Sequence, residues 1–314
     1  MRVFVAGASG AIGRRLIPLL VRAGHVVVGM TRSLGKADTI RAAGAEPVVA
    51  DALDANAVAA AVRGARPEVV VHQLTAIPPR VDPRAFARDF APTNRLRSEA
   101  TRHLVAAARA SGARRLVVQS FAGWPYAREG GRVKTEEDPL DPNPPRALRS
   151  ALQAIRELEA AVLTTGAPEG LVLRYGVFYG PGTSLGAGGS LVADIRRRRI
   201  PVVGSGAGVW SFIHVEDAAA ATLAAIERGA PGIYNVVDDD PAPVAEWLPV
   251  LARVLGARPP RRLPAFLVWL VLGELGITLA TRVCGASNAK AKRELGWTPA
   301  HASWRDGFHE ALPG

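Results

Sequence analysis

The sequence is poor in the residues that build disulfides and metal clusters. It has a single cysteine, Cys284, in 314 residues. One thiol can form neither an internal disulfide nor a cysteine-based metal cluster. The six histidines show neither the HxH nor the HExxH spacing that is typical of metal ligands. We therefore expect no metal site.

Lysine is almost absent, although the chain is basic. Lysine and arginine together number 39 and the formal net charge is +11, but the only lysines are Lys36, Lys134, Lys290 and Lys292. The one dense basic cluster, at 196–199, lacks the interleaved aromatic residues that stack on bases. We expect a solvated helix end there and no nucleic-acid partner, while the positive field favours phosphorylated or acidic small ligands.

Long unbroken apolar runs are missing as well. The most apolar segment, 263–280, is interrupted by Glu274 and two glycines, which makes it too short and broken for a membrane span. We expect it to be a buried helix, or else part of an apolar substrate pocket. The N-terminus begins MRVFVAGASG, without a charged and then apolar leader, so we expect a cytoplasmic protein with no membrane partner.

What is present is a series of strand–helix units. Apolar runs of strand length alternate with longer helical segments over the first 175 residues. Continuous apolar runs are typical of parallel strands with both faces buried. The pattern predicts an α/β fold, a Rossmann-type doubly wound parallel sheet with a smaller C-terminal substrate lobe. The predicted strands lie at 2–6, 25–30, 46–50, 68–74, 115–120 and 170–176.

The pattern changes after Gly176. Glycine- and proline-rich loops separate shorter helices, and 232–238 is the one further clear strand. We therefore expect a discontinuous second lobe with a cleft between it and the sheet. The predicted boundaries are 1–175 for an NADP-binding Rossmann domain, with 205–240 contributing back to it, and 176–204 and 241–314 for the substrate-binding lobe.

A glycine-rich loop follows the first predicted strand and opens a helix. Gly7 permits a tight turn, Gly10 lets the backbone approach a pyrophosphate, and Gly13 lets the helix pack closely on the sheet. The phosphates would then lie at the helix N-terminus. The position of the loop within repeated βαβ units favours a dinucleotide site over a structural turn. Ser9, Ala11 and Ile12 complete the predicted loop.

The end of the second predicted strand indicates which dinucleotide binds. An NAD site usually offers an acidic residue there to the ribose 2′-hydroxyl, but this chain has Thr31 and Arg32, with Lys36 nearby. Arg32 can make a forked contact with a 2′-phosphate. We therefore predict NADP(H) rather than NAD(H). Asp51, followed by Ala52, ends the third strand and is either an adenine contact or a helix cap.

These motifs and several later ones resemble the extended short-chain dehydrogenase/reductase (SDR) superfamily, of the epimerase/dehydratase type. The resemblance extends over nearly the whole chain and keeps the order of the family's motifs. The matching segments after the glycine loop are TNRLRSEATRHLVAAARASGARRLVVQS, EEDPLDP, LRYGVFYGPG, WSFIHVEDAAAATLAA, GIYNVVDDDP and SNAKAKRELGWTPAHASWRDGF.

The resemblance implies a role for each matching position. His214 and Asp217 would order the second lobe rather than act in catalysis. Ser120 would match the family's catalytic serine, and Asn94 would brace the central helix. The remaining cofactor contacts would come from Leu74, Thr75 and Ala76 after the fourth strand and from Tyr175, Gly176 and Phe178 beside the nicotinamide.

The family's catalytic pair is missing. The pattern is a Tyr with a Lys four residues later, on the helix after the PLxP turn at 139–142. Counting from that turn gives Arg146 and Ser150, whereas anchoring on Glu157 gives Arg149 and Gln153. No Tyr-x-x-x-Lys occurs anywhere in the chain. The sequence therefore predicts an atypical member.

Three interpretations of the missing pair remain open. The first is a reductase whose acid or oxyanion group has moved, with Ser120, Tyr126 and Arg146 as catalytic candidates. The second is a non-redox isomerase, cyclase or dehydratase. The third is a catalytically silent NADP(H)-sensing binding protein. The complete second lobe and its glycine-rich loops argue for a filled substrate site.

We favour the first interpretation. The expected function is NADP(H)-dependent reduction of a carbonyl or activated double bond in a moderately apolar small metabolite. The apolar and aromatic character of the lobe indicates that substrate class, with Trp124, Tyr179 and Trp210 as the predicted substrate contacts. The helix at 148–163 carries apolar residues at helical spacing, and in the family this helix commonly packs into a homodimer.

Overall fold

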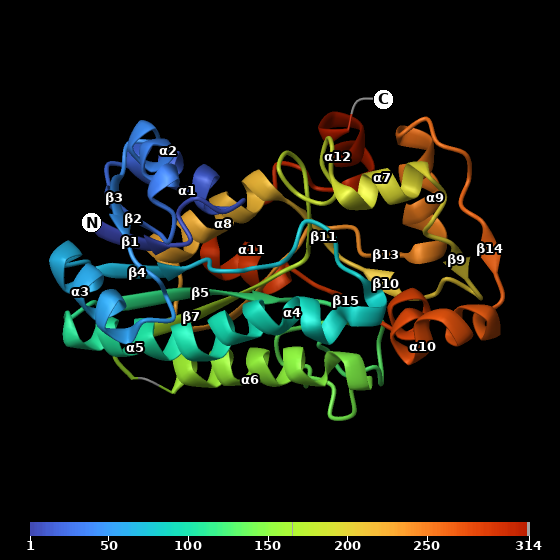
Figure 1. Cartoon of the computed structure of the whole chain (residues 1–314), viewed down its shortest axis with the longest axis horizontal. Coiled ribbons are helices and arrows are strands. Elements are labelled where there is room, and N and C mark those ends of the chain that lie inside the picture. Colours follow the sequence, from blue (N-terminus) through green and yellow to red (C-terminus); the bar gives the residue numbers. More distant parts are fainter. Residues whose placement is uncertain (165, 313–314) are drawn as a thin grey trace.

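A seven-stranded parallel sheet forms the centre of the molecule (Figure 1). The computed structural model describes residues 1–164 and 166–312. In the strand order β12-β7-β5-β4-β1-β2-β3, the chain proceeds outward from β1 to β3 on one side and from β4 to β12 on the other, as in a doubly wound Rossmann sheet. The predicted fold class is therefore confirmed. The strands are β1 (Arg2–Ala6), β2 (Val26–Thr31), β3 (Glu46–Val49), β4 (Val69–His72), β5 (Arg115–Phe121), β7 (Glu169–Tyr175) and β12 (Gly232–Val236).

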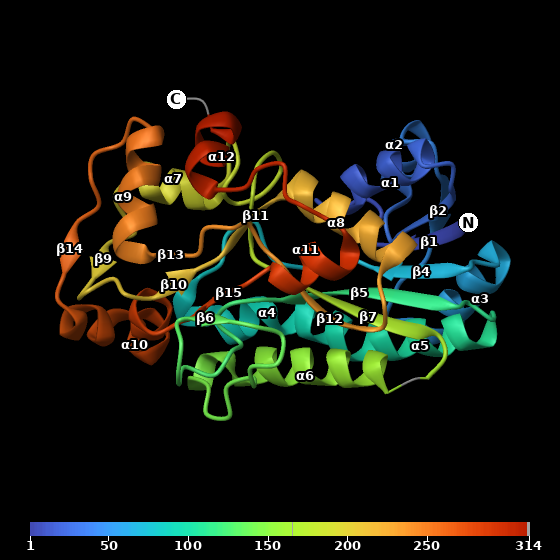
Figure 2. The same cartoon turned by 180° about the vertical axis from the view of Figure 1, so that it is seen from behind.

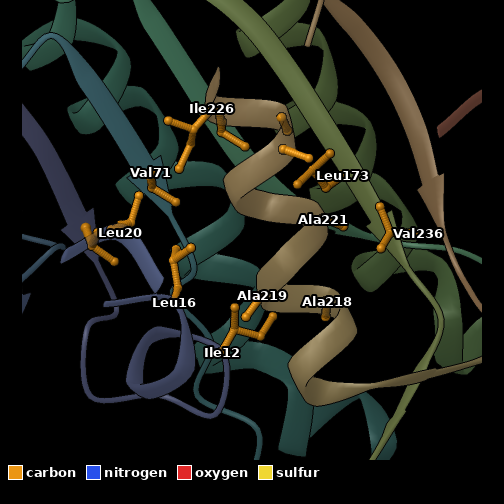
Figure 3. Packing of buried hydrophobic residues seen from close by; sticks show 14 of the residues in the cluster. Ile12, Leu16, Leu20, Val71, Leu173, Ala218, Ala219, Ala221, Ile226 and Val236 are labelled. Carbon is orange, nitrogen blue, oxygen red and sulfur yellow. The ribbon is translucent and has the colours of Figure 1, made fainter. Parts of the chain in front are cut away.

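Helices cover both faces of this sheet, which explains why its central strands are apolar throughout. One layer contains α1, α2, α8 and α11, and the other contains α3, α4, α5 and α6. Figure 3 shows Leu16 of α1 on the side of α8 that carries Ala219, while Ala218 and Ala221 lie on the other side of α8, toward Val236 of β12. The helices are α1 (Gly13–Arg22), α2 (Ala37–Ala42), α3 (Ala55–Ala65), α4 (Phe86–Arg95), α5 (Thr101–Ala110), α6 (Arg149–Leu163), α8 (Val215–Arg228) and α11 (Ala289–Leu295).

A second lobe packs beside the carboxyl ends of the strands (Figure 2). Its core gathers Phe212, Trp247, Trp304 and Phe308, whose rings meet at centroid distances of 5.4–6.2 Å. Short strand pairs β8–β11, β9–β14 and β10–β13 frame this core. Its elements are α7 (Ser190–Arg196), α9 (Val244–Val254), α10 (Ala265–Thr281), α12 (Trp304–Ala311), β8 (Val177–Tyr179), β9 (Val202–Val203), β10 (Val209–Trp210), β11 (Phe212–His214), β13 (Ala242–Pro243) and β14 (Arg262–Leu263).

Helix α11 lies outside the lobe to which its sequence position assigned it. Ala291 and Leu295 are fully buried in the same core cluster as α1 and α8, so α11 covers the sheet. The chain leaves the lobe before α11 at β15 (Gly285–Ala286), which pairs with β6 (Val133–Lys134). The substrate lobe is therefore interrupted once more within 241–314.

Helix α10 corrects a second expectation. The apolar segment 263–280 does form a helix, but the first half of that helix is exposed rather than buried. Gly273 interrupts it with φ 58° and ψ −154°, a conformation that favours glycine. Among the described residues, no helix has the length and apolar character needed to cross a bilayer.

Candidate cofactor and active site

The glycine loop between β1 and α1 depends on close backbone packing. Gly7 has φ +93°, and a Cβ atom there would lie 2.6 Å from the carbonyl oxygen of Gln73. A Cβ atom at Gly13 would lie 2.3 Å from the oxygen of Gly7. At Gly10 the nearest atom would be 3.2 Å away, so the protein leaves more room there. The loop thus holds a tight turn directly before the N-terminus of α1, the end of a helix at which phosphates bind.

A cavity of about 580 Å³ opens beside this loop, over the carboxyl ends of β1, β2, β3 and β4. Strands of an open α/β sheet bind ligands at this edge. It brings together ten of the predicted cofactor residues: Gly7, Ser9, Gly10, Thr31, Arg32, Asp51, Ala52, Leu74, Thr75 and Ala76. Lining residues that the sequence did not indicate are Met30, Ser33, Ala50, Leu53, Gln73, Arg88, Ala91, Pro92, Arg95 and Leu96.

One end of the cavity carries cations without partners. Arg32 and Lys36 are exposed and form no ion pair within the described ranges. The two arginines on the α4 side of the cavity, by contrast, already have carboxylate partners. Arg95 donates to Glu99 at 2.8 and 2.9 Å, and Arg88 pairs with its neighbour Asp89. Positive charge is therefore available at the end of β2, where the 2′ position of an adenosine ribose would lie.

Asp51 serves the turn in which it lies. One of its carboxylate oxygens accepts the N–H of Leu53 at 2.9 Å. This bond closes a turn and is not the helix cap that the sequence left open, since Asp54 caps α3 by accepting from Asn56 and Ala57. The Asp51 carboxylate lines the cavity with its exposed side.

Seven predicted cofactor residues lie outside this cavity's lining. Ala11, Ile12 and Gly13 form the start of α1, directly behind the loop. Asn94 instead joins two helices, because its Nδ2 donates to the Oγ of Ser150 on α6 at 3.5 Å. The other three are Tyr175, Gly176 and Phe178.

Tyr175 is enclosed beneath the sheet edge. Its hydroxyl accepts from Nε2 of Gln73 at 3.2 Å and bonds the hydroxyl of Thr222 at 2.6 Å. Its side chain therefore fixes Gln73, which does line the cavity. Phe178 packs on the ring of Tyr175, and Gly176 allows the close approach of β11, since a Cβ atom there would lie 2.7 Å from the oxygen of Ser211.

Ser120 and Tyr126, two of the predicted catalytic groups, belong to a buried polar network. The Ser120 hydroxyl donates to Glu159 at 2.7 Å. Arg174 donates to both oxygens of Glu159, at 2.8 and 2.6 Å, and to the Tyr126 hydroxyl at 3.0 Å. Tyr126 in turn donates to Asn235 at 2.6 Å. Burial raises the pKa of Tyr126, so the phenol stays protonated. In this structure its role is to hold the network together.

The helix that should carry the missing pair presents an apolar face to the sheet. Positions spaced by four share a helix face, so Ala151 and Ile155 lie in line with Glu159. Both are fully buried. The residues that we placed at the Tyr and Lys positions, Arg146 with Ser150 and Arg149 with Gln153, are all exposed.

The buried face of this helix indicates a third register beside these two. Glu157, the anchor of the second register, is a surface residue that accepts from Gln153 at 3.0 Å. The carboxylate that meets the strand ends is Glu159, two residues later. With Glu159 as the anchor, the positions of the pair would be Ala151 and Ile155, neither of which can transfer a proton.

The predicted substrate residues occupy three different environments. Trp124 is half-buried against an apolar cluster formed by Phe86, Leu148, Ala151 and Leu275. Trp210 is also half-buried and donates from Nε1 to the oxygen of Leu279 on α10, at 3.0 Å.

Tyr179 is fully enclosed, with its ring against His214 and Phe308. Its hydroxyl has no hydrogen-bond partner among the described residues. Tyr179 therefore shapes the interior of the lobe and does not line an open substrate surface.

A cluster of His214, Asp217 and His301 has ligand atoms within 4.8 Å of one another. Asp217 already accepts the N–H groups of Ala300 and His301 and the Nδ1 of His301, at 2.8–3.0 Å. This carboxylate ties the C-terminal segment to α8, the ordering role that the resemblance implies.

The geometry agrees with comparisons to known proteins. Residues 3–236 match the profile of the NAD dependent epimerase/dehydratase family. The chain is 49% identical to the 3-diazoavenalumate denitrifying reductase of a Streptomyces species, over 98% of this chain and 99% of that protein. It is 30% identical to the dTDP-4-dehydrorhamnose reductase of Streptomyces griseus, over 99% and 93%.

The fold also matches solved structures. The UDP-glucose 4-epimerase of Thermotoga maritima superposes with a TM-score of 0.77 at 22% identity, covering 99% of this chain and 97% of that one. Two reductases among the relatives and the family profile together confirm the predicted enzyme class, an SDR-type oxidoreductase. The chain belongs to the NAD-dependent epimerase/dehydratase family of the extended SDR superfamily, as a member without the Tyr–Lys pair.

Proposed function

We propose that this enzyme is an NADP(H)-dependent reductase that replaces the diazonium group of an otherwise apolar small molecule by hydrogen, with release of dinitrogen. The observation that carries the proposal is the apolar helix face at Ala151 and Ile155. The proposal narrows the function predicted from the sequence to a reaction that needs no proton donor at this position.

The chemistry explains why the pair can be absent. Reduction of a carbonyl leaves an alkoxide, which a general acid must protonate, and such help is worth roughly 10²–10⁴-fold. Hydride addition to a diazonium carbon differs: the hydride pair forms the C–H bond, and the C–N pair leaves with N₂. Charge and electrons balance without a proton. The absence of a proton donor at Ala151 and Ile155 is then no handicap to the reaction.

The reductase that is 49% identical supports this assignment, because its name states a diazo substrate and a denitrifying reduction. The three catalytic candidates from the sequence have no proton-transfer role in this proposal. Ser120 and Tyr126 hold the network around Glu159, and Arg146 is exposed at the start of the short helix Arg146–Leu148.

The chain's residues fit an NADP(H) molecule. Bound in the cavity, the reduced nicotinamide would supply the hydride. The glycine loop and the start of α1 would hold the pyrophosphate, and Leu74 to Ala76 would lie along the cofactor. Arg32, Ser33 and Lys36 would bind the 2′-phosphate, since both cations lack an ion-pair partner within the described ranges.

The cofactor preference is tested by titrating the protein with NADPH and NADH. We expect tighter binding of NADPH, and Arg32→Ala should reduce the preference about tenfold, equivalent to about 1.4 kcal/mol. Arg63→Ala, which removes an exposed arginine from α3, is the matched control and should leave the ratio unchanged. Equal affinities in the unaltered protein would refute the role of Arg32.

The reaction is tested with benzenediazonium salts and NADPH deuterated on either face of C4. We expect deuterium from one face in the new C–H bond, one N₂ per NADPH consumed, and no solvent isotope effect on kcat. Because diazonium salts react slowly with reductants in solution, the Gly13→Ala variant with the same NADPH serves as the background. Turnover of ketones with a solvent isotope effect, and none of diazonium salts above that background, would disprove the proposal.

A further inference from the structure

Helix α10 exposes a continuous apolar surface at the end of the molecule opposite the N-terminus (Figures 1 and 2). Its exposed side chains are Phe266 (65%), Leu267 (41%), Trp269 (59%), Leu270 (70%) and Val271 (53%). Other exposed large hydrophobic residues are dispersed along the chain. A contiguous apolar patch of this kind marks an interaction surface.

The patch surrounds much of the helix instead of forming one stripe. At 100° per residue, five exposed residues within six positions cover about 200° of the circumference. In this half of the helix Val268 is the buried residue, and Leu275 is buried beyond the Gly273 kink. Exposure on several sides suits immersion of the helix in a soft apolar phase, and tryptophan and phenylalanine favour the bilayer–water boundary.

Positive charge rims this surface. Arg262 and Arg261 are exposed and lie three and four residues before the helix, and the exposed Arg258 lies farther back along the same segment. Arg84 contacts the helix by donating to the oxygen of Val271 at 3.3 Å, and Arg282 follows its last turn. None of these five arginines forms an ion pair with a carboxylate within residues 1–164 and 166–312.

The carboxylate within α10 itself, Glu274, lies beyond the Gly273 kink and outside the apolar patch. Unpaired arginines beside an apolar helix match anionic lipid headgroups, at about 1 kcal/mol per basic residue near such a surface. A second copy of the chain would bring only the same basic residues to the interface and no additional acidic partner for them.

We propose that the first half of α10, with Arg261 and Arg262, docks on the surface of an anionic phospholipid bilayer. Phe266, Trp269 and Leu270 insert among the lipids, and the arginines contact the phosphates. The helix lies in the interface and does not span the bilayer, in agreement with its length. Its second half packs through Leu275 on the apolar cluster that contains Ala151 and Trp124, so docking places that cluster near the lipid. This surface is independent of the reaction proposed above.

The test is flotation of the full-length protein with vesicles of phosphatidylglycerol and phosphatidylcholine, compared with phosphatidylcholine alone. We expect binding to the anionic vesicles, and this binding should weaken at least tenfold between about 0.05 and 0.5 M salt. The reason is that added salt shortens the Debye length and screens the attraction between the arginines and the lipid phosphates. Trp269→Ser with Leu270→Ser should abolish binding, and Arg261→Glu with Arg262→Glu should weaken it at least tenfold. Trp269→Phe should keep binding but lose part of the vesicle-induced blue shift of tryptophan emission.

Matched controls separate docking from general charge or instability. Arg63→Glu with Arg102→Glu makes the same charge change on α3 and α5, and Val26→Ser removes an exposed apolar residue from β2; both should bind like the unaltered protein. Absence of flotation with anionic vesicles would overturn the proposal. So would a dimer in sedimentation that the Trp269→Ser and Leu270→Ser changes convert to monomer, since a second copy would then cover the patch.

Discussion

The two halves of the carboxyl edge of the sheet have opposite characters. Over β1, β2 and β3 the edge is open and polar, with glycine backbone, hydroxyls and unpaired cations around a cavity. Over β5, β7 and β12 it is closed: Ser120 and Arg174 are buried and donate to Glu159 of α6, and the buried Asn235 accepts from Tyr126. The polar groups of the first half are therefore accessible to a ligand, whereas those of the second half are buried and bonded within the protein.

This difference indicates which part of the family's machinery the protein can lose. A dinucleotide must be held by backbone N–H groups and cations whatever reaction follows, so the first half is constrained. The proton-transfer pair matters only for reactions that create an alkoxide. In the register that we propose, its two positions are Ala151 and Ile155, which are buried in the packing, while Glu159 on the same face keeps its bonds to Arg174.

The largest expected effect is on stability, from Glu159→Ala. This change leaves Arg174 buried without its charge partner, and breaking a buried ion pair in this way costs about 3–5 kcal/mol. Urea unfolding should show the loss. Glu157→Ala, on the exposed side of the same helix, should change stability by less than about 0.5 kcal/mol. Equal effects of the two changes would show that the closed half does not depend on this network.

Gly13→Ala should act on the open half. The new Cβ would meet the oxygen of Gly7 at 2.3 Å, so the loop must shift, at a cost of about 1–3 kcal/mol. The shift moves the N–H groups that would hold the pyrophosphate, and NADPH affinity should fall at least tenfold in a fluorescence titration. Gly64→Ala in α3, where a Cβ would meet nothing within 4 Å, should leave affinity unchanged. Unaltered NADPH binding by Gly13→Ala would place the cofactor elsewhere.

Asp238, just after β12, gives the closed half a pH dependence. Burial raises the pKa of this carboxyl to about 8, from an unfolded value near 4. Between those pH values the unfolded chain loses the proton while the folded chain retains it, so folding stability should fall as pH rises from 4 to 8.

Asp238→Asn removes this titration and keeps a neutral group that can accept the N–H of Asp240. We expect little change at pH 4 and a gain of roughly 1–3 kcal/mol at pH 8, measured by urea unfolding. Asp54→Asn, at the exposed cap of α3, is the control for a general effect of charge. A variant that keeps the full pH slope would contradict the assignment to Asp238.

The same contrast explains what the sequence could predict. Continuous apolar strands and the glycine loop depend on local pattern, and the sheet and much of the cavity lining followed from them. The closed half depends on contacts between distant segments, such as Ser120 with Glu159 and Tyr126 with Asn235. One signal was available: Arg174 is a lone charge in the apolar run LVLRYG, and a charge in a buried strand requires a partner.

The prediction that the segment 263–280 forms a buried helix was wrong for a different physical reason. Composition shows that a segment is apolar but does not show which surface will cover it. The Gly273 kink turns the first half of the helix away from the lobe core, and no pattern in 263–280 shows that direction.

The smallest expected effect is the most informative about catalysis, and it comes from Ser120→Ala. The hydroxyl donates to Glu159, which retains both bonds from Arg174, so its loss should cost about 1 kcal/mol of stability. Because the hydroxyl is enclosed and does not line the cavity, kcat with a diazonium substrate should change less than threefold. A matched loss of a buried hydroxyl, Thr222→Val, controls for stability alone. If kcat instead fell by about 10²–10⁴-fold, the range of general acid catalysis, Ser120 would have to reach the substrate and the closed half would carry chemistry after all.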